Sequence, residues 1–113
     1  MKKPETSPEA KQTYDDIIIK LQADNPEVVA SQMFGMPTLK VLGKGFSGQW
    51  GDGFVVKLTS PKREEALSLP DAVLFDPGMG KPMKEWVVIP LSSKNRWVEF
   101  GLAACHYVME KNT

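Results

Sequence analysis

Apolar residues first recur at helical spacing, at positions i, i+3, i+4 and i+7: Tyr14, Ile17, Ile18 and Leu21. Ser7 can cap such a helix, and Pro8 suits its first helical position. Asp24-Asn25-Pro26 then ends the stripe. The pattern predicts an amphipathic helix from residue 8 to about residue 23, followed by a short turn.

From Met33 onward the pattern changes to the alternation that is typical of β-strands. Five strand segments are expected, near residues 38–42, 46–50, 54–58, 72–75 and 84–90. Gly43-Lys44-Gly45 and Gly51-Asp52-Gly53 are short enough to join the first three segments as an antiparallel meander. Ser60-Pro61 predicts a short helix over residues 62–69, and Ser92 or Ser93 is expected to cap a final helix that ends near Met109.

The predicted order is one helix, about five strands with a short helix inserted, and a C-terminal helix. Strands and helices do not alternate, which excludes a parallel doubly wound sheet and favours the α+β class. With 113 residues the chain has room for one domain, residues 1–113, of which residues 1–6 are expected to be flexible.

Composition and charge exclude several classes of protein. Fourteen Lys and Arg residues balance fourteen Asp and Glu residues, so the net charge provides no attraction to nucleic acid or to an anionic membrane. The one cysteine, Cys105, excludes an internal disulfide and a cysteine-cluster metal site. No apolar run reaches the roughly 18 residues of a membrane span, and the first residues do not resemble a signal peptide. We therefore expect a cytoplasmic protein.

Reactive side chains are not grouped in a way that suggests catalysis. Cys105 and His106 are neighbours on the final predicted helix, where consecutive side chains point about 100° apart and do not face each other. We expect Cys105 in the core and His106 on its flank. No metal-ligand spacing is present, and the serines precede helices, where capping explains them. The expectation is a protein with no catalytic residues, no metal and no cofactor.

Alternation along the strands predicts two different faces of the sheet. Phe54, Val56 and Leu58 share one face, and if the helices cover it, the other face is left open. Four residues then lie on the open face: Lys40, Lys57, Lys84 and Trp86. Trp50 joins them unless a bulge near Gly48 reverses its direction. Met79 and Lys81, in the loop before the last strand, complete the candidate binding residues.

Several motifs together resemble the N-terminal domain of the TfoX family. They are Met33-Phe34-Gly35 before a glycine-turned meander, Gly80-Lys81-Pro82-Met83 before the strand Lys84-Glu85-Trp86-Val87-Val88-Ile89-Pro90, and the closing helix. The resemblance covers about residues 33–110, while the first helix matches only in type. The related YjbR family is a poorer match.

The resemblance implies a curved antiparallel sheet that is covered by helices from both termini. It also implies a small bacterial protein, because many members of the family consist of this single domain. Many of these members have no assigned activity. The family is named after a regulator of natural competence that carries a second, helical domain. This sequence ends at Thr113, so we do not expect that domain here. The family pattern provides no catalytic residues.

Three functions follow as hypotheses. The preferred one is a non-enzymatic interaction or regulatory domain that binds a protein partner, or a second copy, through the open sheet face and the 78–83 loop. An aromatic ring among lysines could instead stack on a nucleobase, as in a nucleic-acid-linked regulator of competence or transcription. The third is a small-ligand-binding protein with a pocket between the curved sheet and the terminal helices.

Overall fold

The computed structural model of the protein describes residues 5–33, 35–76 and 83–111. Three α-helices lie in these ranges, together with a 3-10 helix, η1: α1 Pro8–Asp24, α2 Ser60–Leu67, η1 Leu91–Arg96 and α3 Trp97–Lys111. Six strands accompany them: β1 Val29–Met33, β2 Met36–Val41, β3 Lys44–Trp50, β4 Gly53–Lys57, β5 Val73–Phe75 and β6 Met83–Ile89.

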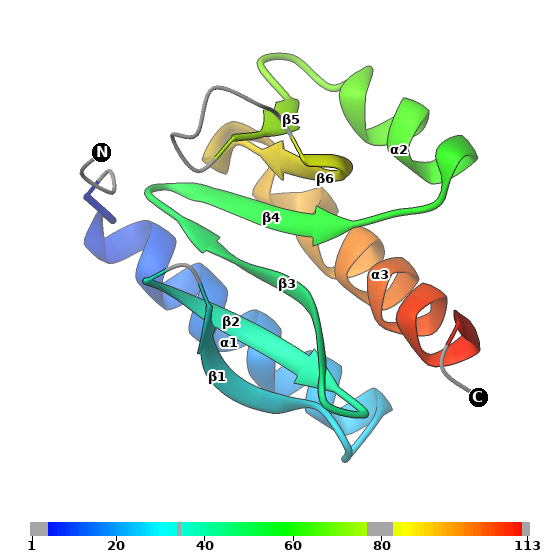
Figure 1. The fold of residues 1–113 in the computed structure, drawn as a ribbon. Coiled ribbons are helices and arrows are strands. Elements are labelled where there is room, and N and C mark those ends of the chain that lie inside the picture. Colours follow the sequence, from blue (N-terminus) through cyan, green and yellow to red (C-terminus); the bar gives the residue numbers. More distant parts are fainter. Residues whose placement is uncertain (1–4, 34, 77–82, 112–113) are drawn as a thin grey trace.

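The strands form one antiparallel sheet in the order β1-β2-β3-β4-β6-β5 (Figure 1). The first four strands are a meander, and the chain then passes through α2 before β5 and β6 pair beyond β4. The α+β class and the antiparallel meander are therefore confirmed. Within the described ranges the sheet has six strands, where about five were expected.

The strand that sequence analysis missed is β1, Val-Ala-Ser-Gln-Met. It is an edge strand whose residues are exposed or half-buried, so it lacks the apolar alternation by which a strand is recognised. Pairing with β2 along its whole length, from Val29↔Lys40 to Met33↔Met36, holds it in the sheet. The short turn that was expected after the first helix is present at residues 26–27, and β1 follows it.

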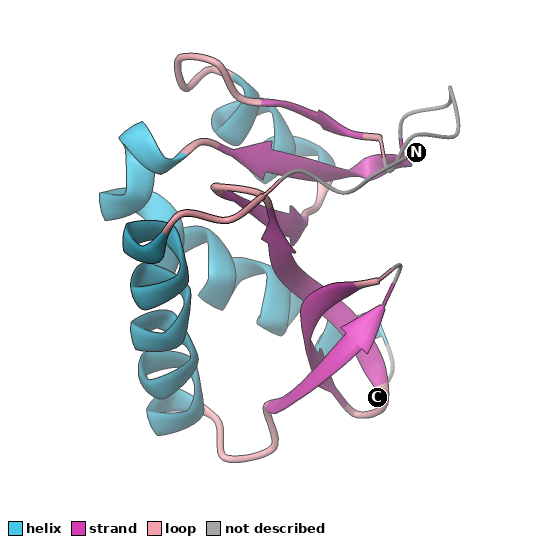
Figure 2. Ribbon diagram, turned by 90° about the vertical axis from the view of Figure 1, so that its left-hand side faces the viewer, coloured by secondary structure: helices cyan, strands magenta, loops and turns pink. Residues whose placement is uncertain are grey.

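All three α-helices lie on one face of the curved sheet (Figure 2). Ser7 caps α1 as predicted, because its Oγ accepts a hydrogen bond of 3.2 Å from the amide of Ala10. The strands supply alternating apolar residues to the core under the helices, and these include Leu39, Val41, Phe54, Val56, Leu58, Val87 and Ile89. The predicted division of the sheet into two faces is confirmed.

The two later helices begin at different residues from those expected. Helix α2 starts at Ser60, after an N-cap at Thr59, and ends at Leu67 rather than Leu69. Residues 91–96 form the 3-10 helix η1, so α3 begins only at Trp97 instead of after Ser93. The Trp97 ring stacks on Phe54 with 5.2 Å between ring centres, so the first residue of α3 is packed in the core.

A β-bulge interrupts β3 before Gly48 and leaves the direction of Trp50 as expected. Leu39 pairs with Ser47 and Lys40 pairs with Gly45, so Phe46 is the extra residue and enters the core under the helices. The irregularity lies before Gly48 and leaves the following alternation intact. Trp50 therefore joins the helix-free face, where its ring meets Phe75 edge-on at 5.3 Å.

Candidate functional site

The helix-free face of the sheet carries a second apolar cluster. Its buried members are Met36, Val55, Phe75 and Trp86. Trp86 lies on the predicted face, but only 7% of it is exposed, so the expectation of an open indole is wrong. Large side chains from β2, β4, β5 and β6 gather around it on the curved sheet and exclude solvent. A buried indole cannot stack on a nucleobase.

The three predicted lysines that the structure describes do not form one surface. Lys57 is half-buried, with its Nζ 3.8 Å from Glu85 Oε2 and 6.0 Å from the centre of the Trp86 ring. Lys84 on β6 is exposed, whereas Lys40 on β2 is half-buried and separated from it by β3 and β4. Met79 and Lys81 lie outside the described residues.

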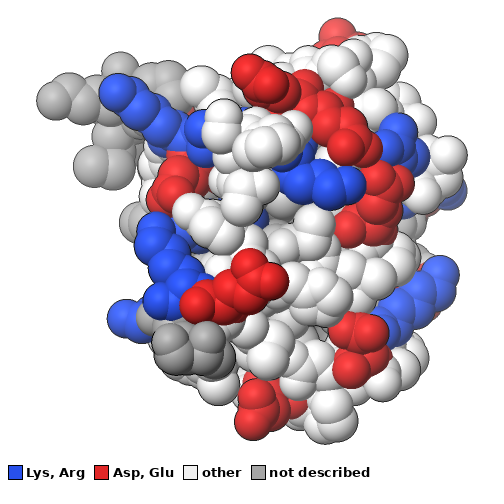
Figure 3. Space-filling view, turned by 90° about the vertical axis from the view of Figure 1, so that its right-hand side faces the viewer, with Lys and Arg blue, Asp and Glu red and all other residues white. Residues whose placement is uncertain are grey.

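Charges of both signs alternate on the face shown in Figure 3. A network of charged residues joins α2, η1 and α3: Arg96 Nη2 of η1 lies 2.9 Å from Glu65 Oε2, and Arg96 Nε lies 2.8 Å from Glu99 Oε1. Lys62 Nζ lies 3.3 Å from Glu65 Oε1. The cations of this network are matched by carboxylates, so these described residues do not form a positive stripe for a phosphate backbone.

Glu85 on β6 contacts side chains of β4 and α3. The Tyr107 hydroxyl donates a hydrogen bond of 2.6 Å to Glu85 Oε1, and Lys57 and Lys111 each bring Nζ within 3.8 Å of the carboxylate. The Tyr107 hydrogen bond is the main cause that lowers the pKa of Glu85 below its ordinary value. The ionised, paired carboxylate links β6 to β4 and α3.

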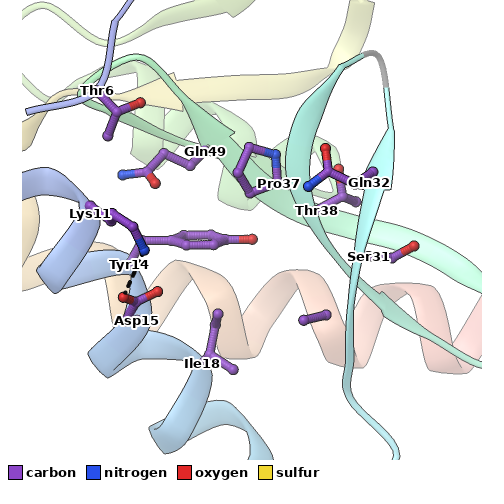
Figure 4. A pocket seen from close by; sticks show the side chains of 11 residues that line it. Thr6, Lys11, Tyr14, Asp15, Ile18, Ser31, Gln32, Pro37, Thr38 and Gln49 are labelled. Atoms are coloured by element: carbon purple, nitrogen blue, oxygen red, sulfur yellow. Dashed lines mark hydrogen bonds and ion pairs between the residues drawn. The ribbon is translucent and has the colours of Figure 1, made fainter.

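A pocket of about 290 Å³ opens between α1 and the β1–β2 hairpin (Figure 4). Helix α1 contributes Tyr14 and Ile18, and the hairpin contributes Ala30, Gln32 and Pro37. This volume is close to the lower end of the range found for small-molecule sites. We call it the α1–hairpin pocket.

Tyr14 is the unusual residue of the pocket. Only 4% of it is exposed, and its hydroxyl, which points from α1 toward the strands in Figure 4, has no hydrogen-bond partner. Burial, and to a smaller degree the charge of Asp15, raise the pKa of Tyr14 above its ordinary value, so the phenol stays protonated. An unpaired buried hydroxyl costs about 1–3 kcal/mol, which an acceptor on a ligand would recover.

Several of the charged and polar groups around the pocket are already paired. Lys11 Nζ lies 3.2 Å from Asp15 Oδ2, and this exposed pair neutralises itself. Gln49 Nε2 donates a hydrogen bond of 2.9 Å to the carbonyl of Ala10, and Thr6 Oγ1 donates one of 2.9 Å to the carbonyl of Gly51. The lining combines apolar side chains with the polar side chains of Ser31 and Gln32 and the Tyr14 phenol, and its one lysine and one aspartate give it no net charge.

Cys105 and His106 lie where the sequence placed them. Cys105 is 1% exposed, and burial raises the pKa of its thiol. His106 is exposed, with Nε2 3.5 Å from Asp24 Oδ2. Over residues 5–33, 35–76 and 83–111, no group of three or more His, Cys, Asp or Glu side chains is arranged to hold a metal ion. None of the helices in these ranges is long and apolar enough to cross a bilayer.

Sequence reasoning named no residue of the α1–hairpin pocket, although one hypothesis placed a pocket between the sheet and the terminal helices. Two weak signals were present in the sequence. Tyr14 puts a hydroxyl into an apolar stripe, and Gln49 puts an amide at a strand position that alternation assigns to the core. No family model, curated protein or solved structure matches this chain. The resemblance to the TfoX N-terminal domain stays a prediction.

Proposed function

We propose that this protein is a non-enzymatic binding domain whose recognition site is the α1–hairpin pocket. The observation that carries the proposal is the unpartnered Tyr14 hydroxyl, which is buried beside a pocket of about 290 Å³ that Tyr14 helps to line. Burying an unpaired polar group lowers stability, and a hydrogen bond to a ligand would offset that cost. The residues that line the pocket supply contacts and orientation, and the proposal assigns them no role in a reaction.

The proposed ligand places a small, uncharged group with a hydrogen-bond acceptor in the pocket. Lys11 is already neutralised by Asp15, so an anionic ligand gains little attraction and meets the Asp15 carboxylate. A cationic ligand would lie beside the Lys11 ammonium group. A neutral oxygen acceptor is the group that matches the protonated Tyr14 hydroxyl.

Three probes of nearly the same shape test this proposal: benzamide, benzoate and benzamidinium. Each is titrated into the ¹⁵N-labelled protein while backbone chemical shifts are recorded. We expect benzamide to shift residues that line the pocket, Tyr14, Ile18 and Gln49 among them, at lower concentration than either charged probe. The proposal fails if no probe binds at the pocket, or if the charged probes bind there as well as benzamide does.

A second candidate is self-association through the helix-free face. Four half-buried apolar side chains on this face favour it: Met33, Trp50, Met83 and Val88. Equal numbers of positive and negative residues also mean that two copies carry no net repulsion. Light scattering across a concentration series would show a dimer that Trp50→Glu dissociates and that Lys62→Glu, on α2, leaves intact. A monomer at every concentration would eliminate this candidate.

We also propose a cytoplasmic location and a regulatory role among TfoX-like bacterial proteins. The support for this role is the resemblance over about residues 33–110. A direct role on nucleic acid has less support, because Trp86 is buried and Lys57 lies beside the Glu85 carboxylate. A fluorescence anisotropy titration with labelled DNA at low salt, in which no binding occurs, would remove the nucleic-acid alternative.

A further inference from the structure

We infer that the ligand of the α1–hairpin pocket is an extended, uncharged peptide segment that pairs with the outer edge of β1. This inference rests on the proposed function, because the segment would fill the same pocket. It adds the ligand class and the way in which the backbone is recognised. Strand addition of this kind gains affinity from main-chain hydrogen bonds and specificity from pockets for side chains.

The register of the hairpin shows which backbone groups of β1 face outward. Only two residues separate the paired residues Met33 and Met36, so this pair is hydrogen-bonded, and the bonding alternates along the ladder. Ser31 therefore bonds toward β2, whereas Ala30 and Gln32 direct their N–H and C=O groups away from it.

Pro37 supports this assignment independently. It is the partner of Gln32 and has no N–H group to donate. A Cβ atom built on Gly48 would lie 2.6 Å from the Pro37 carbonyl oxygen, which places that carbonyl beside β3 and not toward Gln32. The outward groups of Gln32 are thus available without breaking the pairing of β1 with β2.

The composition of β1 leaves its outer edge open to pairing. β1 is the terminal strand in the sheet order, and it contains no charged residue and no proline, the residues that usually block edge-to-edge pairing. An added strand would follow a wall of the pocket, because the two residues whose backbone faces outward, Ala30 and Gln32, also line it. The neutral lining favours an uncharged segment over an acidic or basic one.

The pocket beside this edge fits one peptide unit and its side chain. An apolar side chain would lie against Ile18 and Pro37, and a peptide carbonyl would accept the Tyr14 hydrogen bond. The hydroxyl is closed to bulk water, so the carbonyl reaches it when part of the lining moves aside. Gln32, whose side chain is exposed, lines the pocket on the strand side.

The probe for the test is the capped peptide acetyl-Thr-Val-Ser-Leu-Thr-amide, titrated into the full-length ¹⁵N-labelled protein. We expect it to slow hydrogen exchange of the Ala30 and Gln32 amides at least fivefold and to leave the exchange of Ser31 unchanged. The matched control peptide carries N-methyl groups at Val and Leu, which remove the main-chain N–H donors of these two residues. This control needs no protein variant, and we expect it to bind at least tenfold more weakly.

Two variants test the same edge from the side of the protein. Gln32→Pro removes the outward N–H and leaves the β2 pairing intact, so we expect peptide affinity to fall at least tenfold. Gln32→Ala keeps that N–H, and its affinity should stay within about twofold of the original protein, in line with the small effect of surface changes. Thermal unfolding of both variants verifies that each remains folded.

Three outcomes would overturn the inference: unchanged exchange at Ala30 and Gln32, equal binding of the N-methylated peptide, or peptide shifts confined to β5. If benzamide still binds at the pocket in those cases, the proposed function stands and only the peptide assignment falls. If neither benzamide nor the peptide binds there, both fail.

Discussion

The side-chain amide of Gln49 on β3 holds the first turn of α1 against the sheet. Its Nε2 donates a hydrogen bond of 2.9 Å to the backbone carbonyl of Ala10, 39 positions away in the sequence. Gln49 is 3% exposed and Ala10 is fully buried. Ala10 lies about one helical turn before Tyr14, so this bond also sets the distance between the Tyr14 ring and the strands.

Replacing Gln49 by Leu is expected to lower the free energy of unfolding by about 1–2 kcal/mol. The change keeps a similar volume but removes the donor and leaves the second lone pair of the Ala10 carbonyl without its partner. Urea denaturation measures the effect. The control is Gln12→Leu on the exposed face of α1, which should change stability by less than about 0.5 kcal/mol. Equal losses in the two variants would contradict the anchoring role.

Tyr14→Phe is expected to raise the free energy of unfolding by about 1 kcal/mol. It removes a buried hydroxyl without a partner and keeps the ring, whose centre lies 6.2 Å from that of Phe54. Thermal unfolding should show the midpoint rise by roughly 4 °C. Tyr107→Phe is the matched control, because its hydroxyl donates to Glu85 and its loss should not stabilise the protein. A lower midpoint for Tyr14→Phe would mean that the hydroxyl is paired in solution.

Gly48→Ala is expected to destabilise the sheet by about 2 kcal/mol or more, because a Cβ atom at Gly48 would lie 2.6 Å from the Pro37 carbonyl oxygen. That oxygen belongs to the backbone, so β2 and β3 would have to separate. Gly45→Ala, on the same strand, meets the flexible end of Met33 at 3.3 Å and the Thr38 methyl group at 3.4 Å, and it should cost less because both neighbours are side chains. Chemical denaturation of both variants provides the comparison, and an equal cost would argue against close strand approach at Gly48.

Ionisation of Glu85 makes the free energy of unfolding depend slightly on pH. Its pKa is lowered from 4.5, first by the Tyr107 hydrogen bond and then by Lys57 and Lys111. A carboxyl group whose pKa is lower in the folded protein than in the unfolded chain stabilises the fold at pH values above its pKa in the unfolded chain. This stabilisation is lost as the pH falls through the pKa that the group has in the folded protein. Tyr107→Phe should therefore raise the pKa of Glu85 in a ¹³C NMR titration.

Tyr107→Phe should also reduce the difference between the free energies of unfolding at neutral and at acidic pH. The narrowing is expected to stay below about 1 kcal/mol, because the carboxylate is 40% exposed and solvent screens it. Lys111→Ala, which removes a weaker interaction, serves as the control and should raise the pKa by less. An unchanged pKa in Tyr107→Phe would contradict the assigned cause.

The sequence by itself determined the elements that are specified by residues close to one another in the chain. Ser7 and Pro8 mark the start of α1, the glycine turns mark the β2–β3 and β3–β4 hairpins, and alternation separates Phe54 and Val56 from Val55. Each of these depends on residues within a few positions of one another. Neighbouring φ and ψ angles and the two-residue period of a strand are enough to establish them.

Only the tertiary structure decided which distant residues pack against each face of the sheet. Trp86 has the predicted orientation, yet its burial depends on Met36 and Phe75, which come from other strands. β1 is a strand because β2 pairs with it, and the Tyr14 hydroxyl lacks a partner because the hairpin and α1 close around it. Burial and hydrogen bonding between distant segments arise when the sheet curves and the helices pack on it, and no local pattern encodes them.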